Sequence, residues 1–467
     1  MADTLIRPVE APRIPVPDGL PLPQRYWALL TIALGLTLAV LDGAIANVAL
    51  PTIARDVNAS PAASIWVVNA YQLAVTISLL PLASLGEIYG YRRIYQGGLV
   101  VFTIASLCCA LSSSLVTLTA ARIIQGFGAA GIMSVNGALI RFIYPRRWLG
   151  RGVGLNATIG SIASATGPTV AAAILAVAPW PWLFAVNLPL GLIAIPIAWK
   201  ALPPTPTSGQ RFDVISAILS ALTFGLAITA IAGLGHGEGL GNVGAELFLT
   251  VGIGFVLVAR QMSRTSPLLP VDLLRIPLFA LSIATSVCSF LAQSMALVSL
   301  PFLFENTLGF NEVTTGLLMT PWPLTVAVIA PFTGRIADRY PVGILSGGGL
   351  AVMALGLLSL AMLPAHPSSL DIIWRMTVCG LGFGFFNTPN NRAIITSAPP
   401  VRSGGASGMQ ATSRLLGQTM GAACVALVFG LFPMHGTTVS MLFAACASVA
   451  AAGVSFTRMM GSGARKT

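Results

Sequence analysis

An acidic and a basic residue stand inside two long apolar stretches of the chain, Asp42 in the first and Arg122 in the fourth. A charge at bilayer depth costs at least a few kcal/mol unless it is paired or faces a water-filled cavity, so such residues usually mark a transport pathway. Asp42 lies nine residues before Pro51, and Arg122 lies seven or eight residues inside its stretch, which places them about 13 Å and about 11 Å from the outer side. We expect the two side chains to interact, directly or through water.

Two carboxyl groups within the apolar stretches, those of Asp42 and Glu305, are candidates for proton uptake. A buried carboxylate near an arginine can bind a proton or a cationic substrate once motion separates the pair, which is what proton–substrate exchange requires. We therefore predict that Asp42, Arg122 and Glu305 couple protons to transport, with Asp42 as the central group. Two alternatives stay open: Arg122 neutralises Asp42 permanently and only locks helix packing, and Glu305, near the outer end of its stretch, is simply solvated.

The composition leaves few classes of protein open. Of 467 residues, 55% are hydrophobic and only 8% are charged, which is too little polar surface to cover a soluble globule. The sequence has no Gly-x-x-x-x-Gly-Lys loop for ATP and no nucleophile paired with a base, so we expect neither enzyme activity nor ATP-driven pumping. No cofactor or metal is expected. The cysteines lie inside apolar stretches and are interpreted as packing residues: Cys108, Cys109, Cys288, Cys379, Cys424 and Cys446.

Fourteen apolar stretches are long enough to cross the hydrocarbon core of a bilayer, which takes about 20 residues of helix. To within a few residues they are 26–50, 63–86, 94–113, 115–140, 150–177, 182–201, 212–234, 243–262, 279–303, 313–335, 342–363, 369–396, 404–432 and 434–457. Basic residues gather in alternate loops, and the intervening loops hold only Arg55 beside several acids. Because basic loops stay in the cytoplasm, both termini are expected there, and the formal charge of +11 indicates topology and not a nucleic-acid partner.

An internal repeat divides the chain. Arg122 with Gly126 and Gly128 recurs as Arg375 with Gly380 and Gly382, and other repeated stretches share the same displacement of about 250 residues. The pattern predicts a cytoplasmic tail at 1–25, a six-helix half at 26–201, a linker with two extra transmembrane helices at 202–278, a second six-helix half at 279–457 and a tail at 458–467. The fold class is all-α integral membrane, with a site expected near the midplane between the halves.

Two motifs resemble those of a known transporter family. Leu41-Asp42-Gly-Ala-Ile-Ala-Asn47-Val-Ala-Leu-Pro51 resembles the first-helix signature of the fourteen-helix drug:proton antiporter branch of the major facilitator superfamily. Arg122-Ile-Ile-Gln125-Gly126-Phe-Gly128 is similar to the superfamily's helix-four motif, whose arginine is implicated in proton transfer. The resemblance covers nearly the whole chain and implies the major facilitator fold, with two six-helix pseudo-repeats and two extra central helices.

Residues 83–92 are similar to the superfamily's Gly-x-Leu-Ala-Asp-Arg-x-Gly-Arg-Lys motif, although Ala83 and Glu87 replace its first glycine and its aspartate. In the family this motif is a charge latch that stabilises the outward-facing state. The resemblance implies that the latch survives with altered strength; loop charges that only set topology are the alternative. The latch residues, with those of the second copy, are Glu87, Arg92, Arg93, Asp338 and Arg339.

The fifth apolar stretch contains Gly160 and the pair Gly167-Pro168, in a pattern that resembles the antiporter motif of family exporters. Alanines replace three glycines of that motif, so a bend must come mainly from Gly167-Pro168. The resemblance favours export. A Gly-Pro pair that serves helix packing and has no bearing on transport direction is the alternative.

Polar and aromatic side chains within the stretches are candidates for a substrate cavity, since pockets for drug-sized ligands combine apolar walls with a few polar anchors. Ordinary packing or interfacial belts are the alternative for each of them. Arg414 belongs to a pattern that resembles the branch's eleventh core helix. The candidates are Asn47, Asn69, Tyr71, Gln72, Gln125, Phe290, Gln293, Trp322, Phe386, Asn387 and Arg414.

The favoured function is a proton-coupled secondary transporter that exports amphiphilic or cationic drugs and toxic compounds by alternating access. An exporter of one physiological metabolite on the same fold is the main alternative, and a non-transporting receptor or an intramembrane enzyme is a third class. The expected partners are the lipid bilayer, protons and a small amphiphilic substrate, with the protein as a monomer. The Arg-rich, Lys-poor composition indicates a bacterial cytoplasmic membrane.

Overall fold

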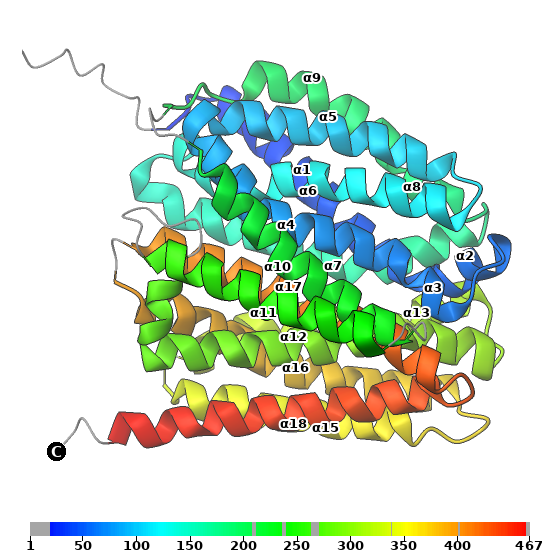
Figure 1. Cartoon of the computed structure of the whole chain (residues 1–467). Coiled ribbons are helices and arrows are strands. Elements are labelled where there is room, and N and C mark those ends of the chain that lie inside the picture. Colours follow the sequence, from blue (N-terminus) through cyan, green and yellow to red (C-terminus); the bar gives the residue numbers. More distant parts are fainter. Residues whose placement is uncertain are drawn as a thin grey trace, which may run out of the picture.

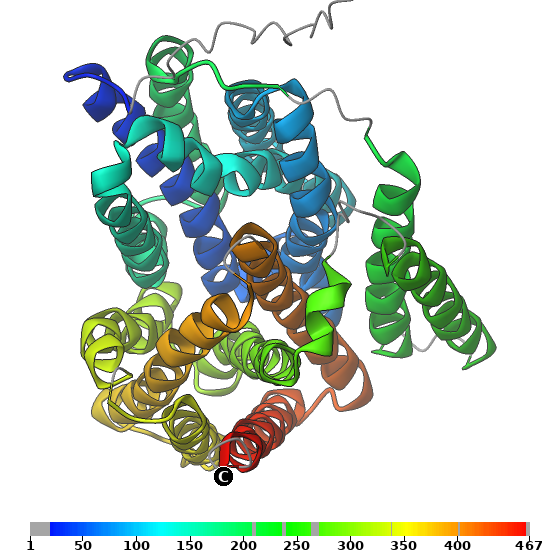
Figure 2. The same ribbon diagram turned by 90° about the vertical axis from the view of Figure 1, so that its left-hand side faces the viewer.

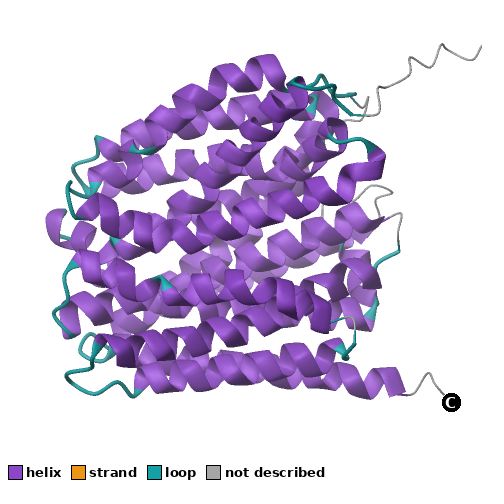
Figure 3. Cartoon of the chain, turned by 180° about the vertical axis from the view of Figure 1, so that it is seen from behind, coloured by secondary structure: helices purple, strands orange, loops and turns teal. Residues whose placement is uncertain are grey.

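The computed structural model describes residues 19–207, 212–235, 240–262, 270–337, 339–399 and 402–463. Within this part of the chain, fourteen helices are long and apolar enough to cross a membrane, so the predicted number is confirmed. They lie side by side in one bundle, and the described residues form no strands (Figures 1 and 3).

The first half contains α1 (Gln24–Val48), α2 (Leu50–Asp56), α3 (Pro61–Ser64), α4 (Trp66–Tyr89), α5 (Tyr91–Ala110), α6 (Leu115–Ile143), η1 (Arg146–Trp148), α7 (Leu149–Leu175), α8 (Pro181–Ala185) and α9 (Asn187–Ala201). Helices α10 (Val214–Gly235) and α11 (Leu240–Met262) follow. The second half contains η2 (Val271–Arg275), α12 (Pro277–Phe302), η3 (Leu303–Thr307), α13 (Glu312–Met319), α14 (Pro321–Ile336), α15 (Val342–Ala361), α16 (Ser369–Ser397), α17 (Ser403–Leu431) and α18 (Gly436–Gly463).

The bundle has two distinct ends. Helix α1 begins and α18 ends at the same end of the molecule, on the left in Figure 1. We call this the near end and the opposite one the far end. Viewed from the near end, the two halves form two groups of helices, and α10 and α11 stand together beside them (Figure 2).

Close glycine contacts repeat from one half to the other. A Cβ atom added to Gly126 of α6 would lie 2.6 Å from the backbone oxygen of Tyr71 in α4. The same atom on Gly380 of α16 would lie 2.6 Å from the backbone oxygen of Trp322 in α14. Since only glycine lets the helix backbones approach this closely, both halves rest on the same pair of contacts. The predicted fold of two six-helix pseudo-repeats with two extra helices is confirmed.

The glycine contacts also correct the predicted register of the repeat. Gly126 and Gly380 are 254 residues apart, and this displacement brings Met376, not Arg375, to the place of Arg122. Met376 is completely buried. Arg375 instead pairs with Asp371 one turn earlier on the same helix, with N and O 3.1 Å apart. The second half therefore has an apolar residue where the first half has a buried charge.

Helices α10 and α11 are joined by an ion pair and a hydrogen bond. Arg260 of α11 donates to Asp213, which precedes α10, over 3.0 Å. Thr229 of α10 donates to Glu246 of α11 over 3.2 Å. Helix α10 packs against α4 of the first half and α17 of the second, so the pair sits where the halves meet.

The two halves touch at the far end. A Cβ atom on Gly316 of α13 would lie 2.7 Å from the backbone oxygen of Pro168 in α7, and the hydroxyls of Thr169 and Thr320 are 2.9 Å apart. Towards the near end, α7 is exposed at Val153, Leu155 and Ile162.

Leucine at Gly128 tests the close contact between α5 and α6. A Cβ atom there would lie 2.4 Å from the backbone nitrogen of Phe102, whereas nothing lies within 4 Å of one on Gly137 of the same helix. We expect Gly128→Leu to cost about 1–3 kcal/mol of stability, the usual range for overpacking. The measurement is the apparent melting temperature of the purified protein in detergent. Gly137→Leu is the control, and equal melting temperatures for both variants would contradict the contact.

Candidate functional site

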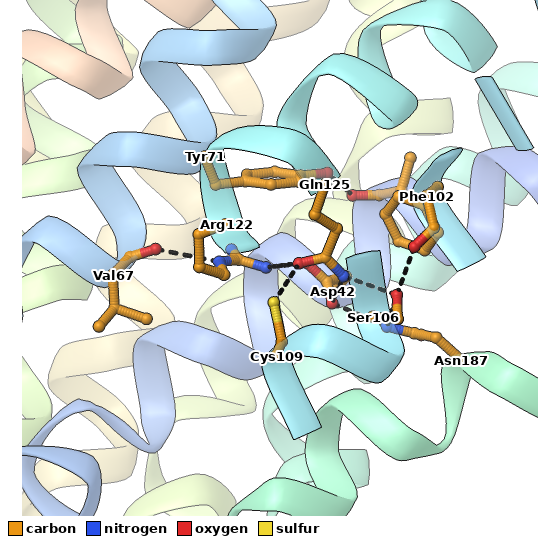
Figure 4. A network of polar contacts seen from close by, with 10 residues as sticks. Asp42, Val67, Tyr71, Phe102, Ser106, Cys109, Arg122, Gln125 and Asn187 are labelled. Atoms are coloured by element: carbon orange, nitrogen blue, oxygen red, sulfur yellow. Dashed lines mark hydrogen bonds and ion pairs between the residues drawn. The ribbon is translucent and has the colours of Figure 1, made fainter. Parts of the chain in front are cut away.

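Asp42 lies at the centre of a buried polar network (Figure 4). Its Oδ2 atom pairs with Nη1 of Arg122, and neither side chain has any exposed surface. Its Oδ1 atom accepts hydrogen bonds from Nε2 of Gln125 over 2.9 Å and from Nδ2 of Asn187 over 2.8 Å. Gln125 Nε2 also donates to Ser106 Oγ over 2.8 Å. The carboxylate thus has donors on both oxygens, as a buried charge requires.

The guanidinium of Arg122 is held from several sides. Its Nε atom donates to the backbone oxygen of Val67 over 3.0 Å, and Nη1 donates to Oε1 of Gln125 over 2.6 Å. The ring of Tyr71 lies 4.2 Å from its central carbon, within cation–π distance. The Nη2 atom is buried and has no hydrogen-bond partner among the described residues.

The network connects five helices of the first half. Asp42 comes from α1, Val67 and Tyr71 from α4, Ser106 from α5, Arg122 and Gln125 from α6, and Asn187 from α9. The contact between Asp42 and Arg122 that we expected is present, and the role of the pair in proton coupling stays a prediction. With no exposed surface, Asp42 is closed to a cationic substrate in this conformation. Protonation of Asp42 would cancel its charge and weaken links among these helices.

Sequence reasoning missed three side chains of this network: Ser106, Asn187 and Cys109, which was interpreted as a packing residue and donates to Oε1 of Gln125 over 3.4 Å. Asn187 is a buried polar residue within the stretch 182–201, which is otherwise apolar except for Lys200 near its end. A search for lone amides in apolar stretches would have found Asn187. A serine satisfied by its own helix is too common in membranes to carry such a signal.

Glu305 belongs to a second charged cluster, at the far end. Arg55 of α2 donates to Glu305 over 2.9 Å and to Glu312 over 3.0 Å. The Glu305 side chain is fully buried and lies in the π-helical turn η3, so the alternative that it is simply solvated is wrong. Thr52 lies 3.4 Å from Glu305 and donates to it. Because Arg55 belongs to the first half and both acids to the second, this cluster ties the halves together.

The predicted latch is not formed in this conformation. Glu87 is exposed, and among the described residues it makes no ion pair or hydrogen bond. Arg92 instead donates to the backbone oxygen of Trp199, near the end of α9, where a cation meets the negative end of the helix dipole. Residues 83–92 are not a loop: α4 and α5 are separated by Gly90 alone, whose φ of 97° favours glycine. Arg339 is exposed, and Asp338 lies outside the described residues.

The antiporter motif lies at helix contacts. A Cβ atom on Gly167 would lie 2.4 Å from Cβ of Ala44 in α1, which explains the need for glycine there. Pro168 presents its backbone oxygen to Gly316 of the other half. Gly160 is less tightly packed, because a Cβ atom added there would lie 3.7 Å from Leu36. The packing role is therefore visible, and the effect on transport direction stays a prediction.

The predicted cavity residues separate into two groups. Six are buried in this conformation: Asn69, Tyr71, Gln125, Phe290, Trp322 and Phe386. Two of these, Tyr71 and Gln125, belong to the Asp42 network. The amide of Asn69 has no hydrogen-bond partner among the described residues. The others are half-buried: Asn47, Gln72, Gln293, Asn387 and Arg414.

The membrane-spanning bundle of two six-helix halves, with a buried ion pair and a charged cluster across the halves, is the architecture of a membrane transporter. The sequence profile described as Major Facilitator Superfamily matches residues 32–422. The chain belongs to this superfamily.

The relatives include transporters with named substrates. The chain is 59% identical to "Uncharacterized transporter YebQ" of Escherichia coli (strain K12), over 95% of this chain and 97% of that protein. It is 30% identical to "Riboflavin transporter RibZ" of Clostridioides difficile (strain 630), covering 86% of this chain and 87% of RibZ. It is 32% identical to "Multidrug resistance protein Stp" of Mycobacterium tuberculosis (strain CDC 1551 / Oshkosh), covering 86% and 75%. These relatives agree with the drug:proton antiporter branch.

The fold is also that of solved transporters. The crystal structure of a POT family transporter in complex with a thioalcohol-conjugated peptide matches with a TM-score of 0.71 at 13% identity, over 94% of this chain and 96% of that one. At this identity the likeness shows the fold alone.

Glu305→Gln tests whether the far-end cluster holds the halves closed. The substitution removes the negative charge of Glu305, the partner of Arg55 whose side chain is fully buried. We expect the population with an open far end to rise about tenfold, which corresponds to 1.4 kcal/mol. The readout is the rate at which an impermeant maleimide labels Ala172→Cys, a buried position at the contact of α7 with Gly316 of the other half. Glu312→Gln, which removes the more exposed partner of Arg55, should change the rate less. An unchanged rate in Glu305→Gln would contradict the role of the cluster.

Proposed function

We propose that this protein is a proton-coupled exporter of small amphiphilic compounds, working as a monomer by alternating access in a bacterial cytoplasmic membrane. The observation that carries the proposal is the buried Asp42–Arg122 pair, which ties five helices of the first half to one protonatable group. A proton that binds there changes helix contacts, which is what coupling requires.

We propose that the near end faces the cytoplasm. Several exposed arginines lie at this end, including Arg93, Arg147 and Arg339, whereas the far end holds Arg55 engaged with two acids. This distribution follows the positive-inside rule. Both termini are then cytoplasmic. We propose that this conformation is the one open towards the cytoplasm, and the contact of Gly316 with Pro168 at the far end and the unformed latch support that proposal.

The charge preference of the substrate differs from the first expectation. The two carboxylates that could bind a cation within the helices, those of Asp42 and Glu305, are both fully buried and paired with arginines. We therefore propose amphiphilic compounds as the substrate class and place no cation at Asp42 in this conformation. The similarity to the multidrug resistance protein Stp supports a broad range of substrates for this protein. The similarity to the riboflavin transporter RibZ supports the alternative, in which the protein exports a single metabolite.

Asp42→Asn tests proton coupling. In everted membrane vesicles with an acidic interior, uptake corresponds to export, and substrates added outside should release protons from the interior. We expect the wild type to dissipate the gradient, as reported by a pH-sensitive dye, and Asp42→Asn to lose more than about 90% of this signal, since one tenfold loss corresponds to 1.4 kcal/mol. Asp371→Asn is the control because its acid pairs within its own helix at the far end.

Expression and melting temperature of each variant show whether the loss reflects folding, since Asn leaves Arg122 buried without a counter-charge. A well-folded Asp42→Asn protein that still exchanges protons for substrate would rule out Asp42 as the coupling group. A wild type that moves none of a panel of anionic, neutral and cationic amphiphiles would favour the single-metabolite alternative.

A further inference from the structure

Arg414 is a charged residue in the middle of a membrane-spanning helix, and its position on that helix can be derived from neighbouring contacts. Cβ atoms on Gly417 and Gly421 would each lie 2.5 Å from backbone oxygens of α12, those of Val287 and Leu291. Thr419 contacts Thr76 of α4 over 3.3 Å. With about 100° per residue, Arg414 lies about 60° and Thr419 about 200° around the helix from Gly417. Arg414 therefore lies between the face that contacts α12 and the face that contacts α4.

The opposite side of α17 is covered by the two extra helices. Met409, about 280° from Gly417 by the same count, is buried in a cluster with Leu219 of α10 and Leu257 of α11. Viewed from the near end, α17 runs between the two halves, with α10 and α11 outside it (Figure 2). The side that carries Arg414 is thus directed away from α10 and α11, towards the interior of the molecule.

Exposure along this side of α17 falls steadily from the near end to the far end. Ser407 is exposed, Arg414 and Gln418 are half-buried, and Ala422 and Val425 have no exposed surface. All five lie within about 80° of one another around the helix. This side of α17 is therefore accessible at the near end and buried beyond Gln418, and Arg414 lies close to the boundary between the two parts.

Arg414 has no counter-charge. Among the described residues it makes no hydrogen bond or ion pair, and its Nε atom is buried without a partner. The acids that could neutralise it within the helices are engaged elsewhere: Asp42 with Arg122, and Glu305 and Glu312 with Arg55. A guanidinium left in this way at membrane depth is costly, and transporters retain such groups where a ligand completes the pair.

We propose that Arg414 binds the acidic group of the substrate, and that the exported compounds are amphiphilic organic anions. The guanidinium fork matches carboxylates, sulfonates and phosphates, with which it forms two parallel hydrogen bonds. A cation on the same path would meet an unneutralised positive charge in a medium of low dielectric constant. Exposed arginines at the near end, such as Arg147 and Arg151, attract anions to the entrance. The inference rests on the proposed export function and names its substrate class.

Three probes of one shape test the proposal: 4-(1-pyrenyl)butanesulfonate, the corresponding sulfonamide and the corresponding trimethylammonium compound. The sulfonate stays charged at all working pH values, so a pH gradient does not move it passively. Uptake into everted vesicles with an acidic interior reports transport, and pyrene fluorescence with purified protein in detergent reports binding. We expect the wild type to prefer the sulfonate over both other probes.

Arg414→Gln should weaken sulfonate binding and uptake at least about tenfold, which corresponds to 1.4 kcal/mol, while sulfonamide binding changes little. Arg414→Lys should restore part of the preference because it keeps the charge and loses the fork. Arg375→Gln is the control, because this arginine lies in the same half but pairs with Asp371.

Each result decides between specific explanations. Sulfonate binding that is equal in wild type and Arg414→Gln overturns the proposal, and so does a wild type that prefers the trimethylammonium probe. If the wild type binds the sulfonate through Arg414 but transports none of the probes, the binding site stands and the export function fails. If it transports the probes without discriminating among them, export stands and the anion site fails.

Discussion

The first half of this protein depends on one ion pair that has no exposed surface. Neither Asp42 nor Arg122 can remain charged alone at this depth, so α1 and α6 must stay together as long as both are ionised. Gln125 and Asn187 complete the hydrogen bonds of the carboxylate and bring α9 into the same constraint. A proton on Asp42 removes the constraint at its centre. The group that holds the helices together is thus also the one that a proton can change.

The two halves repeat in backbone and differ in chemistry. The glycine contacts of α6 with α4 recur in α16 with α14, yet Met376 occupies the place of Arg122 and Trp322 that of Tyr71. The second half therefore carries no counterpart of the buried pair among these positions. It supplies instead Glu305 and Glu312, which hold the far end through Arg55, and Arg414, which faces the interior without a partner. If the proton binds at Asp42 and the substrate at Arg414, as we propose, the two use different residues and their coupling passes through helix movement.

The sequence was sufficient for the fold because the signals that define it are local. Apolar stretches of membrane length predicted the helices, and depth along α1 and α6 predicted the contact of Asp42 with Arg122. The sequence did not predict the contacts that depend on how each helix is rotated about its own axis. Asn187 joins Asp42 because of the face that α9 presents, and Tyr71 and Gln125 turn into the network and not into a cavity. The prediction that Arg375 corresponds to Arg122 was wrong because Arg375 lies five residues before Gly380, whereas Arg122 lies four residues before Gly126.

The central claim is that protonation of Asp42 controls which end of the molecule is open. The direct measurement is the distance between spin labels on Ser113 and His366, exposed residues in corresponding far-end loops of the two halves, determined by electron paramagnetic resonance at several pH values. We predict that the distance distribution of the wild type shifts with pH and that the distribution of Asp42→Asn does not. A pH-dependent shift in Asp42→Asn equal to that of the wild type would contradict the claim.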